Sequence, residues 1–103
     1  MPVKWTAKTE PTERNEKVLA ALSKALGHPA RVRILRTLMN RGICTCRELV
    51  DALPLAQATV SQHLKILREA GCVTSEAEGT SRCYRINPAA LLRLNNAVDA
   101  IAQ

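Results

Sequence analysis

The sequence predicts a mainly helical domain with a small β-hairpin, arranged as a winged helix-turn-helix with an additional helix at each end. Three observations point to this fold. Apolar residues make up 47% of the 103 residues and aromatic residues only 2%, which suits a core of packed helices. A short apolar segment, a turn marked by Pro54 and a longer amphipathic segment closed by Gly71 follow one another, as in a helix-turn-helix. After Gly71 the apolar period changes from helical to extended, which indicates a hairpin.

A chain of this length holds one domain, which we expect to span residues 13–103 behind a flexible N-terminal arm of residues 1–12. The arm mixes Pro, Thr and opposing charges without an apolar period. No apolar run approaches the roughly 20 residues that cross a membrane, so we expect a cytoplasmic protein without a membrane partner. Four cysteines in a reducing compartment are expected to stay thiols.

Two helices are expected in the first part of the domain. The first runs from Glu13 to Leu26, where Gly27 ends it. The second begins at Pro29, a first-turn position at which the missing N–H costs nothing, and residues 40–42 (Asn-Arg-Gly) stop it after Met39. The apolar positions of the two helices are Val18, Leu19, Leu22, Ala25, Leu26, Ile34, Leu35, Leu38 and Met39.

The next two helices form the predicted helix-turn-helix. Thr45 and Glu48 have the spacing of a capping box and start the third helix, which Pro54 ends. The fourth helix spans residues 57–70, with Gly71 as its left-handed cap. The inward positions of both helices are Leu49, Val50, Leu53, Val60, Leu64 and Leu67.

The last part of the chain is expected to form a wing and a final helix. Residues 73–78 and 82–87 are the strands of a hairpin that turns at residues 78–81. Asn87 and Pro88 then start a helix whose apolar stripe is Leu91, Leu94, Val98 and Ile101. Apolar helices at both ends of so short a chain suggest that dimerisation completes the core.

The positive charge of the chain is concentrated in one region. The net charge is +6, and residues 17–47 contain no acidic residue. Such a region attracts polyanions, and nucleic acid is the leading candidate. Its basic residues are Lys17, Lys24, Arg31, Arg33, Arg36, Arg41 and Arg47.

The side of the fourth helix opposite its apolar stripe carries the candidate DNA-binding residues. Gln can form a bidentate pair with adenine, and Ser, Thr and Lys can contact bases or phosphates in a major groove. A polar solvent-facing side is the alternative, but the short helix before and the wing after favour recognition. Arg82 near the wing tip is a further candidate for a phosphate or minor-groove contact, whereas His63 is expected to pack. The residues on this side are Gln57, Ala58, Thr59, Ser61, Gln62 and Lys65.

An enzyme is not expected. The sequence contains no Gly-rich phosphate loop, no nucleophile elbow and no paired carboxylates. A winged-helix protein-interaction module is the stronger rival to a DNA-binding regulator, and the salt dependence of binding separates the two.

Three segments resemble the ArsR/SmtB family of bacterial metalloregulatory repressors. They are LGHPARVRIL (26–35), LAQATVSQHLKILREAG (55–71) and EGTSRCYRI (78–86). The resemblance implies a homodimer paired through its first and last helices, which binds a pseudo-palindromic operator in double-stranded DNA and releases it when an effector binds. The chain departs from the family at Ala56, where a capping Ser is usual.

Cys44 and Cys46 are the candidate effector ligands. They lie on either side of the capping residue at the start of the third helix. Cys46 is in the first turn, where the helix dipole is expected to lower its pKa. Two thiols this close can also bind one soft ion. The resemblance implies a third thiolate from a Cys-x-Cys-x-x-Cys run, but this chain has Leu49 at that position. Cys83, expected to be exposed on the wing, and Cys72, also readable as a small buried hydrophobe, are the alternatives for the third ligand.

Arsenite or antimonite is the preferred effector, and DNA binding itself is expected to need no cofactor. The alternative is a thiol-redox repressor in which oxidants or reactive sulfur link two cysteines. Some relatives carry a zinc-type site on the last helix, built from His and carboxylates. This helix offers only Asp99, so we expect that site to be absent.

Overall fold

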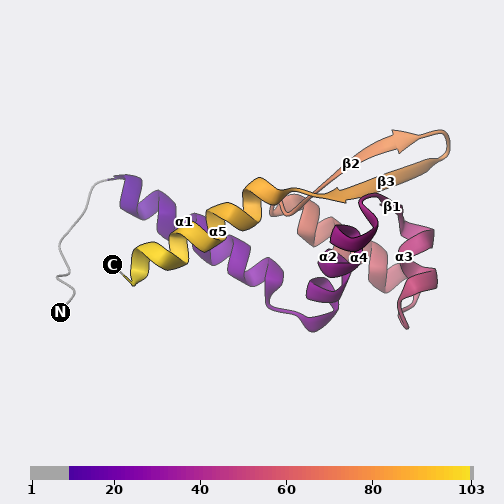
Figure 1. Cartoon of the computed structure of the whole chain (residues 1–103), viewed down its shortest axis with the longest axis horizontal. Helices are drawn as coiled ribbons and strands as arrows, with labels where there is room; N and C mark the ends of the chain where they lie inside the picture. The colour runs from indigo at the N-terminus through magenta and orange to yellow at the C-terminus, as the bar shows by residue number, and fades with distance from the viewer. Residues whose placement is uncertain (1–9, 103) are drawn as a thin grey trace.

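The computed structural model describes residues 10–102 and confirms the predicted winged helix-turn-helix. Helices α3 and α4 form the helix-turn-helix, and strands β2 and β3 form the wing (Figure 1). In chain order the elements are α1 (Glu10–Leu26), α2 (Pro29–Arg41), β1 (Cys44–Thr45), α3 (Cys46–Ala52), α4 (Gln57–Glu69), β2 (Val73–Glu78), β3 (Ser81–Ile86) and α5 (Pro88–Ile101).

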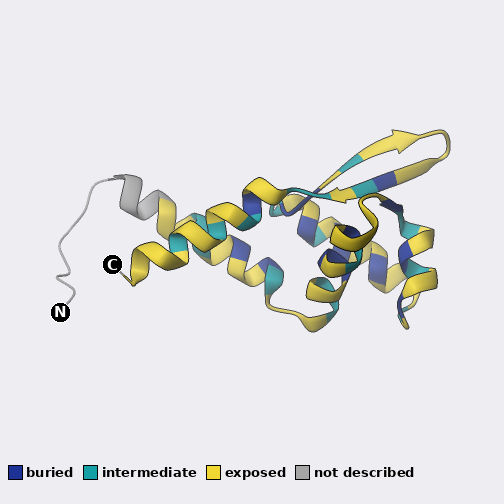
Figure 2. Cartoon of the chain, in the orientation of Figure 1, coloured by how far each residue is buried: buried dark blue, intermediate teal, exposed yellow. Residues whose placement is uncertain are grey.

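The molecule is elongated. Its principal extents are 51 × 25 × 21 Å, and its radius of gyration of 16.1 Å exceeds the about 13 Å of a compact domain of this length. Helices α1 and α5 pack against each other at one end, while the wing projects from the other (Figure 1). Buried residues concentrate in the helix-turn-helix, and much of the α1/α5 pair is exposed (Figure 2). The pair therefore extends beyond the core.

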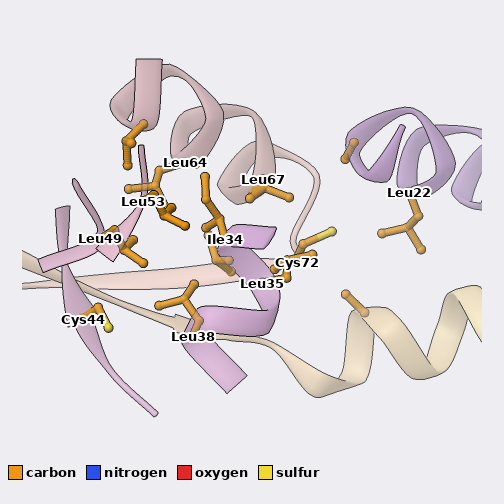
Figure 3. Close-up of a cluster of buried hydrophobic side chains, with 14 residues drawn as sticks. Leu22, Ile34, Leu35, Leu38, Cys44, Leu49, Leu53, Leu64, Leu67 and Cys72 are labelled. Atoms are coloured by element: carbon orange, nitrogen blue, oxygen red, sulfur yellow. The ribbon is translucent and has the colours of Figure 1, made fainter. Parts of the chain in front are cut away.

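One apolar cluster joins all the helices (Figure 3). Each fully buried Leu or Ile in it stabilises the fold by about 1.5–3 kcal/mol. Met39, expected on the apolar side of α2, is instead 56% exposed, because the core contacts of α2 are made by three other residues. The residues of α2, α3 and α4 in this cluster are Ile34, Leu35, Leu38, Leu49, Val60, Leu64 and Leu67.

The start of α3 is set by the predicted capping box. The Thr45 hydroxyl accepts the backbone N–H of Glu48 at 3.1 Å, and the Glu48 carboxylate accepts the backbone N–H of Thr45 at 2.9 Å. Hydrogen bonding of the Glu48 carboxylate by the backbone N–H of Thr45, and next by its hydroxyl, lowers the pKa of Glu48, because it stabilises the ionised form. Two backbone donors at the helix start are thereby satisfied.

The sheet contains a strand that the sequence pattern did not indicate. The two-residue strand β1 pairs with β3, which places Cys44 opposite Tyr84 and Thr45 opposite Cys83 in the order β1-β3-β2. Two residues are too few to show an alternating pattern. The hairpin turns at Gly79, whose φ of +62° suits the first turn position of a type II′ turn.

Helix α1 begins at Glu10, three residues before the expected start at Glu13. The end of the expected arm is therefore helical, and Pro11 falls in the first turn, where Pro is tolerated. The rest of the arm lies outside the described residues.

Helix α5 is tied to the end of α4 by Asn87. Its side-chain amide donates to the carbonyl of Gly71 at 2.9 Å, and its backbone N–H donates to the carbonyl of Cys72 at 2.8 Å. Beyond this junction, apolar side chains on the outer part of α5 are exposed within the described part of the chain. Val98 is 50% exposed and Ile101 is 65% exposed.

Helix α4 starts without a side-chain cap. Ala56 occupies the N-cap position, so no side-chain oxygen of that residue accepts from the first turn. We predict that Ala56→Ser raises the free energy of unfolding by about 0.5–2 kcal/mol, because the new hydroxyl accepts one of these orphan N–H groups. Urea denaturation measures the change. The control is Ala58→Ser on the exposed face of the same helix, where no gain is expected; equal stabilisation by both variants would contradict the capping explanation.

Candidate nucleic-acid interface and thiol pair

Helix α4 has one side buried in the core and one side exposed to solvent. Val60, Leu64 and Leu67 are between 0% and 1% exposed and hold the helix in the core. The opposite side is solvent-exposed along the first two and a half turns and is not covered by any other part of the chain that the structure describes. We call this side the reading surface: Gln57, Ala58, Thr59, Ser61, Gln62 and Lys65.

The wing offers one arginine whose charge is not paired with an acid. Arg82 is exposed, and its guanidinium donates to the hydroxyl of Ser75 at 3.3 Å. Arg85, on the same strand, instead lies 3.5 Å from the carboxylate of Glu76. Of these two arginines, Arg82 is the one for which the described residues show no ion pair, and its role as a phosphate contact stays a prediction.

The basic region of residues 17–47 has solvent-exposed side chains and one basic side chain that turns inward. All of its members are exposed except Arg31, which is half-buried and hydrogen-bonded to His63 of α4 at 3.1 Å. His63 is 8% exposed, as expected of a packing residue, and its burial lowers its pKa, with smaller contributions from His28 and Arg31. Sequence reasoning missed this contact, because nothing in the local pattern pairs residues 32 positions apart.

The thiols of Cys44 and Cys46 lie at the start of α3, as expected, but they are not activated. Cys44 is 1% exposed and Cys46 is half-buried. Desolvation by burial raises the pKa of both thiols; for Cys44 the charge of Glu48 raises it further, and Arg41 partly offsets this. The expectation that the helix dipole lowers the pKa of Cys46 is therefore wrong, because desolvation outweighs it.

The two other cysteines are buried as well. Cys72 is 0% exposed, which fits its interpretation as a small hydrophobe in the core. Cys83 is 8% exposed, so the expectation that it is exposed on the wing is wrong. It lies on the central strand, where β1 covers one side and β2 the other, and its thiol donates to the Glu78 carboxylate at 3.1 Å. That hydrogen bond is the main cause of its raised pKa.

No third ligand is gathered around Cys44 and Cys46. Because Cys44 is opposite Tyr84 while Cys83 is opposite Thr45, Cys44 and Cys83 point to opposite faces of the sheet. Cys72 lies in a different part of the core from Cys44 (Figure 3). Within the described part of the chain, no group of three or more His, Cys, Asp or Glu residues is placed to hold a metal ion. A three-thiolate site would need these elements to move.

None of the helices in residues 10–102 combines the length and the apolar character that crossing a bilayer requires.

Known proteins are similar to this chain in both sequence and fold. Residues 28–75 match the model for bacterial regulatory proteins of the arsR family. The chain is 43% identical over 75 residues to an uncharacterized HTH-type transcriptional regulator of Methanocaldococcus jannaschii, covering 72% of this chain and 82% of that protein. It is 43% identical over 81 residues to the HTH-type transcriptional repressor SmtB of Mycobacterium tuberculosis, covering 79% of this chain and 58% of the relative.

Two solved structures have the same architecture. One, described as a possible transcriptional regulator for arsenical resistance, superposes with a TM-score of 0.72 at 32% identity over 79% of this chain and 83% of its own. The other is a homodimeric winged helix-turn-helix DNA-binding domain from Mycobacterium bovis, with a TM-score of 0.73 at 26% identity over 95% and 90% of the two chains. These relatives are transcriptional regulators and not enzymes.

The burial of the thiols generates a prediction about their reactivity. In a short exposure to iodoacetamide at pH 7, we expect Cys46 to be alkylated first, because it alone of the four is not buried. All four should react slowly compared with the urea-unfolded chain, and faster as the pH rises toward and above 9, because a raised pKa leaves little thiolate at neutral pH. Mass spectrometry of the digested protein measures each site. Rapid labelling of Cys44 at pH 7 would show that its thiol is not held in the core.

Proposed function

Because this chain belongs to the arsR family of bacterial regulatory proteins, we propose that it represses transcription as a homodimer that reads a pseudo-palindromic operator with α4. We further propose that arsenite or antimonite, bound by Cys44 and Cys46, releases the DNA. The single observation that carries the DNA-binding part of this proposal is the solvent-exposed reading surface of α4, a helix whose other side is buried in the core.

The reading surface has the chemistry for base contacts. Gln57 and Gln62 can each donate and accept at an adenine edge, and Lys65 can reach a base or a phosphate. Ala58 has a small side chain, so it lets the helix approach the groove floor and can contact a thymine methyl group. Arg82 on the wing adds a contact to the backbone or the minor groove beside the operator half-site.

The exposed apolar residues of α5 support the homodimer. Leu92, Val98 and Ile101 are 60%, 50% and 65% exposed in the single chain. Burying such side chains against a second copy is favourable, and a twofold pair of α1/α5 arms would hold two reading helices for two half-sites. The homodimeric structure from Mycobacterium bovis shows that this fold can assemble in pairs.

Substitutions on the reading surface test DNA recognition. After selection of a preferred duplex, Gln62→Ala should lose about 1–3 kcal/mol of discrimination at one base pair. Lys65→Ala should weaken binding to all sequences and reduce the slope of log Kd against log salt by about one, since one phosphate contact is lost. Fluorescence anisotropy at several salt concentrations measures both effects.

The control is Arg93→Ala on exposed α5, which removes the same charge far from α4. An equal slope change in Arg93→Ala would mean that net charge, rather than a contact by Lys65, determines binding. A wild-type affinity that does not depend on salt would favour a protein-interaction module.

Metalloid binding and thiol oxidation place different demands on the two thiols. The raised pKa values of Cys44 and Cys46 leave few thiolates at neutral pH, which slows the reaction of both thiols with either kind of effector. Arsenite needs no oxidant: each thiol that binds it gives up its proton and one hydroxide of arsenite leaves as water, so an As–S bond replaces an As–O bond. Cys44 packs in the same cluster as Leu49 of α3, so drawing its sulfur to an ion would disturb the start of the helix-turn-helix. That disturbance is the proposed route from effector to DNA release.

Titration of the protein–operator complex with arsenite tests this route. Stoichiometric arsenite should release the wild-type protein, whereas Cys46→Ser and Cys44→Ala should bind DNA normally and no longer respond. Ala is used at residue 44 because a hydroxyl in that buried position would need a partner.

Cys72→Ala is the matched control at a buried thiol and should retain the response. If peroxide releases the complex and arsenite does not, the redox alternative is correct. Loss of DNA binding by the Cys46→Ser variant itself would contradict an effector role.

A further inference from the structure

One guanidinium connects three helices. The Nε–H of Arg31 on α2 donates to Nδ1 of His63 on α4 at 3.1 Å. Its Nη1 donates to the carbonyl oxygens of Lys24 and Ala25 in the last turn of α1, both at 3.2 Å. Those carbonyls lie at the C-terminal end of α1, where a cation is favoured by the helix dipole, and the Lys24 carbonyl also accepts the backbone N–H of Gly27 at 3.2 Å. Arg31 therefore bridges the end of α1 and the inner side of α4.

His63 is suited to be the acceptor in this bridge. Because its Nδ1 accepts the Arg31 proton, the ring is neutral and carries its own proton on Nε2. Burial, followed by the nearby His28 and Arg31, lowers its pKa and so keeps the neutral form. The His28 ring lies 4.5 Å from the His63 ring, and its Nδ1 caps α2 by accepting the N–H of Ala30.

The bridge made by Arg31 lies where few apolar side chains pack between α1 and the helix-turn-helix. Helix α1 contributes Leu22 and Ala25 to the buried core, while most of its other described residues are exposed. With little apolar contact between α1 and the helix-turn-helix, a charge-assisted hydrogen bond has a large share in fixing their relative orientation.

We propose that Arg31 is a positioning residue for operator binding, which sets the angle between the dimerisation arm and the reading helix by joining the end of α1 to His63. The inference rests on the proposed function, in which the α1/α5 arms pair and each α4 reads one half-site. Half-sites lie about one helical turn, or a multiple of it, apart. A small change of angle at this junction would therefore move both reading helices out of register with the two half-sites together.

The test compares two duplexes with the full-length protein. One duplex carries the complete selected operator, and the other has one half-site scrambled. Arg31→Gln should bind the complete operator about tenfold more weakly, the loss expected for one hydrogen bond to a charged group, and the single half-site within about twofold of wild type. Arg33→Gln removes the same charge from an exposed position on the same helix and should change both duplexes by one common factor.

Variants at His63 separate the bridge from general stability. His63→Asn keeps an acceptor near the position of Nδ1, so this variant should retain the wild-type preference for the complete operator. His63→Phe keeps an aromatic ring but has no acceptor, so it should behave like Arg31→Gln. The double variant Arg31→Gln/His63→Phe should be no worse than either single variant, because both remove the same interaction. Binding is measured well below the melting temperature of each variant.

Three results would overturn the proposal. Equal weakening of Arg31→Gln on both duplexes would mean that Arg31 supports the fold of the protomer. A slope of log Kd against log salt reduced by about one would mean that Arg31 contacts a phosphate directly. Additive losses in the double variant would mean that Arg31 and His63 act separately. If the wild-type chain shows no preference for the complete operator, the proposed function itself fails, which the variants alone would not show.

Discussion

Burial of one side of α4 is the interaction on which the rest of this structure depends. Val60, Leu64 and Leu67 are essentially inaccessible to solvent, and they pack in one cluster with Ile34 of α2 and Leu49 of α3. Rotation of α4 about its axis would bring polar side chains into this cluster, at a cost of several kcal/mol each without partners. The core therefore holds the helix in one orientation and leaves its polar side exposed to solvent.

The α1/α5 arm follows a different principle. It adds few residues to the core, extends the molecule to 51 Å and leaves apolar side chains uncovered. Two polar side chains connect it to α4 and its C-terminal end: Arg31 of α2, which bonds the last turn of α1 and His63, and Asn87 at the start of α5, which bonds Gly71. Hydrogen bonds depend on direction as well as distance, so they can fix the angle of an arm that apolar contacts alone would leave adjustable.

The cysteines link the core to the proposed response. Cys44 and Cys72 are part of the apolar cluster in which α4 packs, and Cys83 is a buried residue of the central strand β3. Thiols in such places are protonated and contribute to packing. An effector that binds Cys44 would have to remove it from the core, and the energy of metalloid binding would then be coupled to the orientation of the helix-turn-helix.

The sequence by itself determined the order of the five helices and the hairpin, the capping box at Thr45, the left-handed Gly71 and the polar side of α4, because each depends on residues a few positions apart. Only the tertiary structure decided that β1 pairs with β3, and that Arg31 turns inward to His63. These contacts join residues 32 or more positions apart, and no local period or spacing records which distant groups will meet. The pKa of Cys46 also belongs to the tertiary structure, since the helix start is local but the burial that raises the value is not.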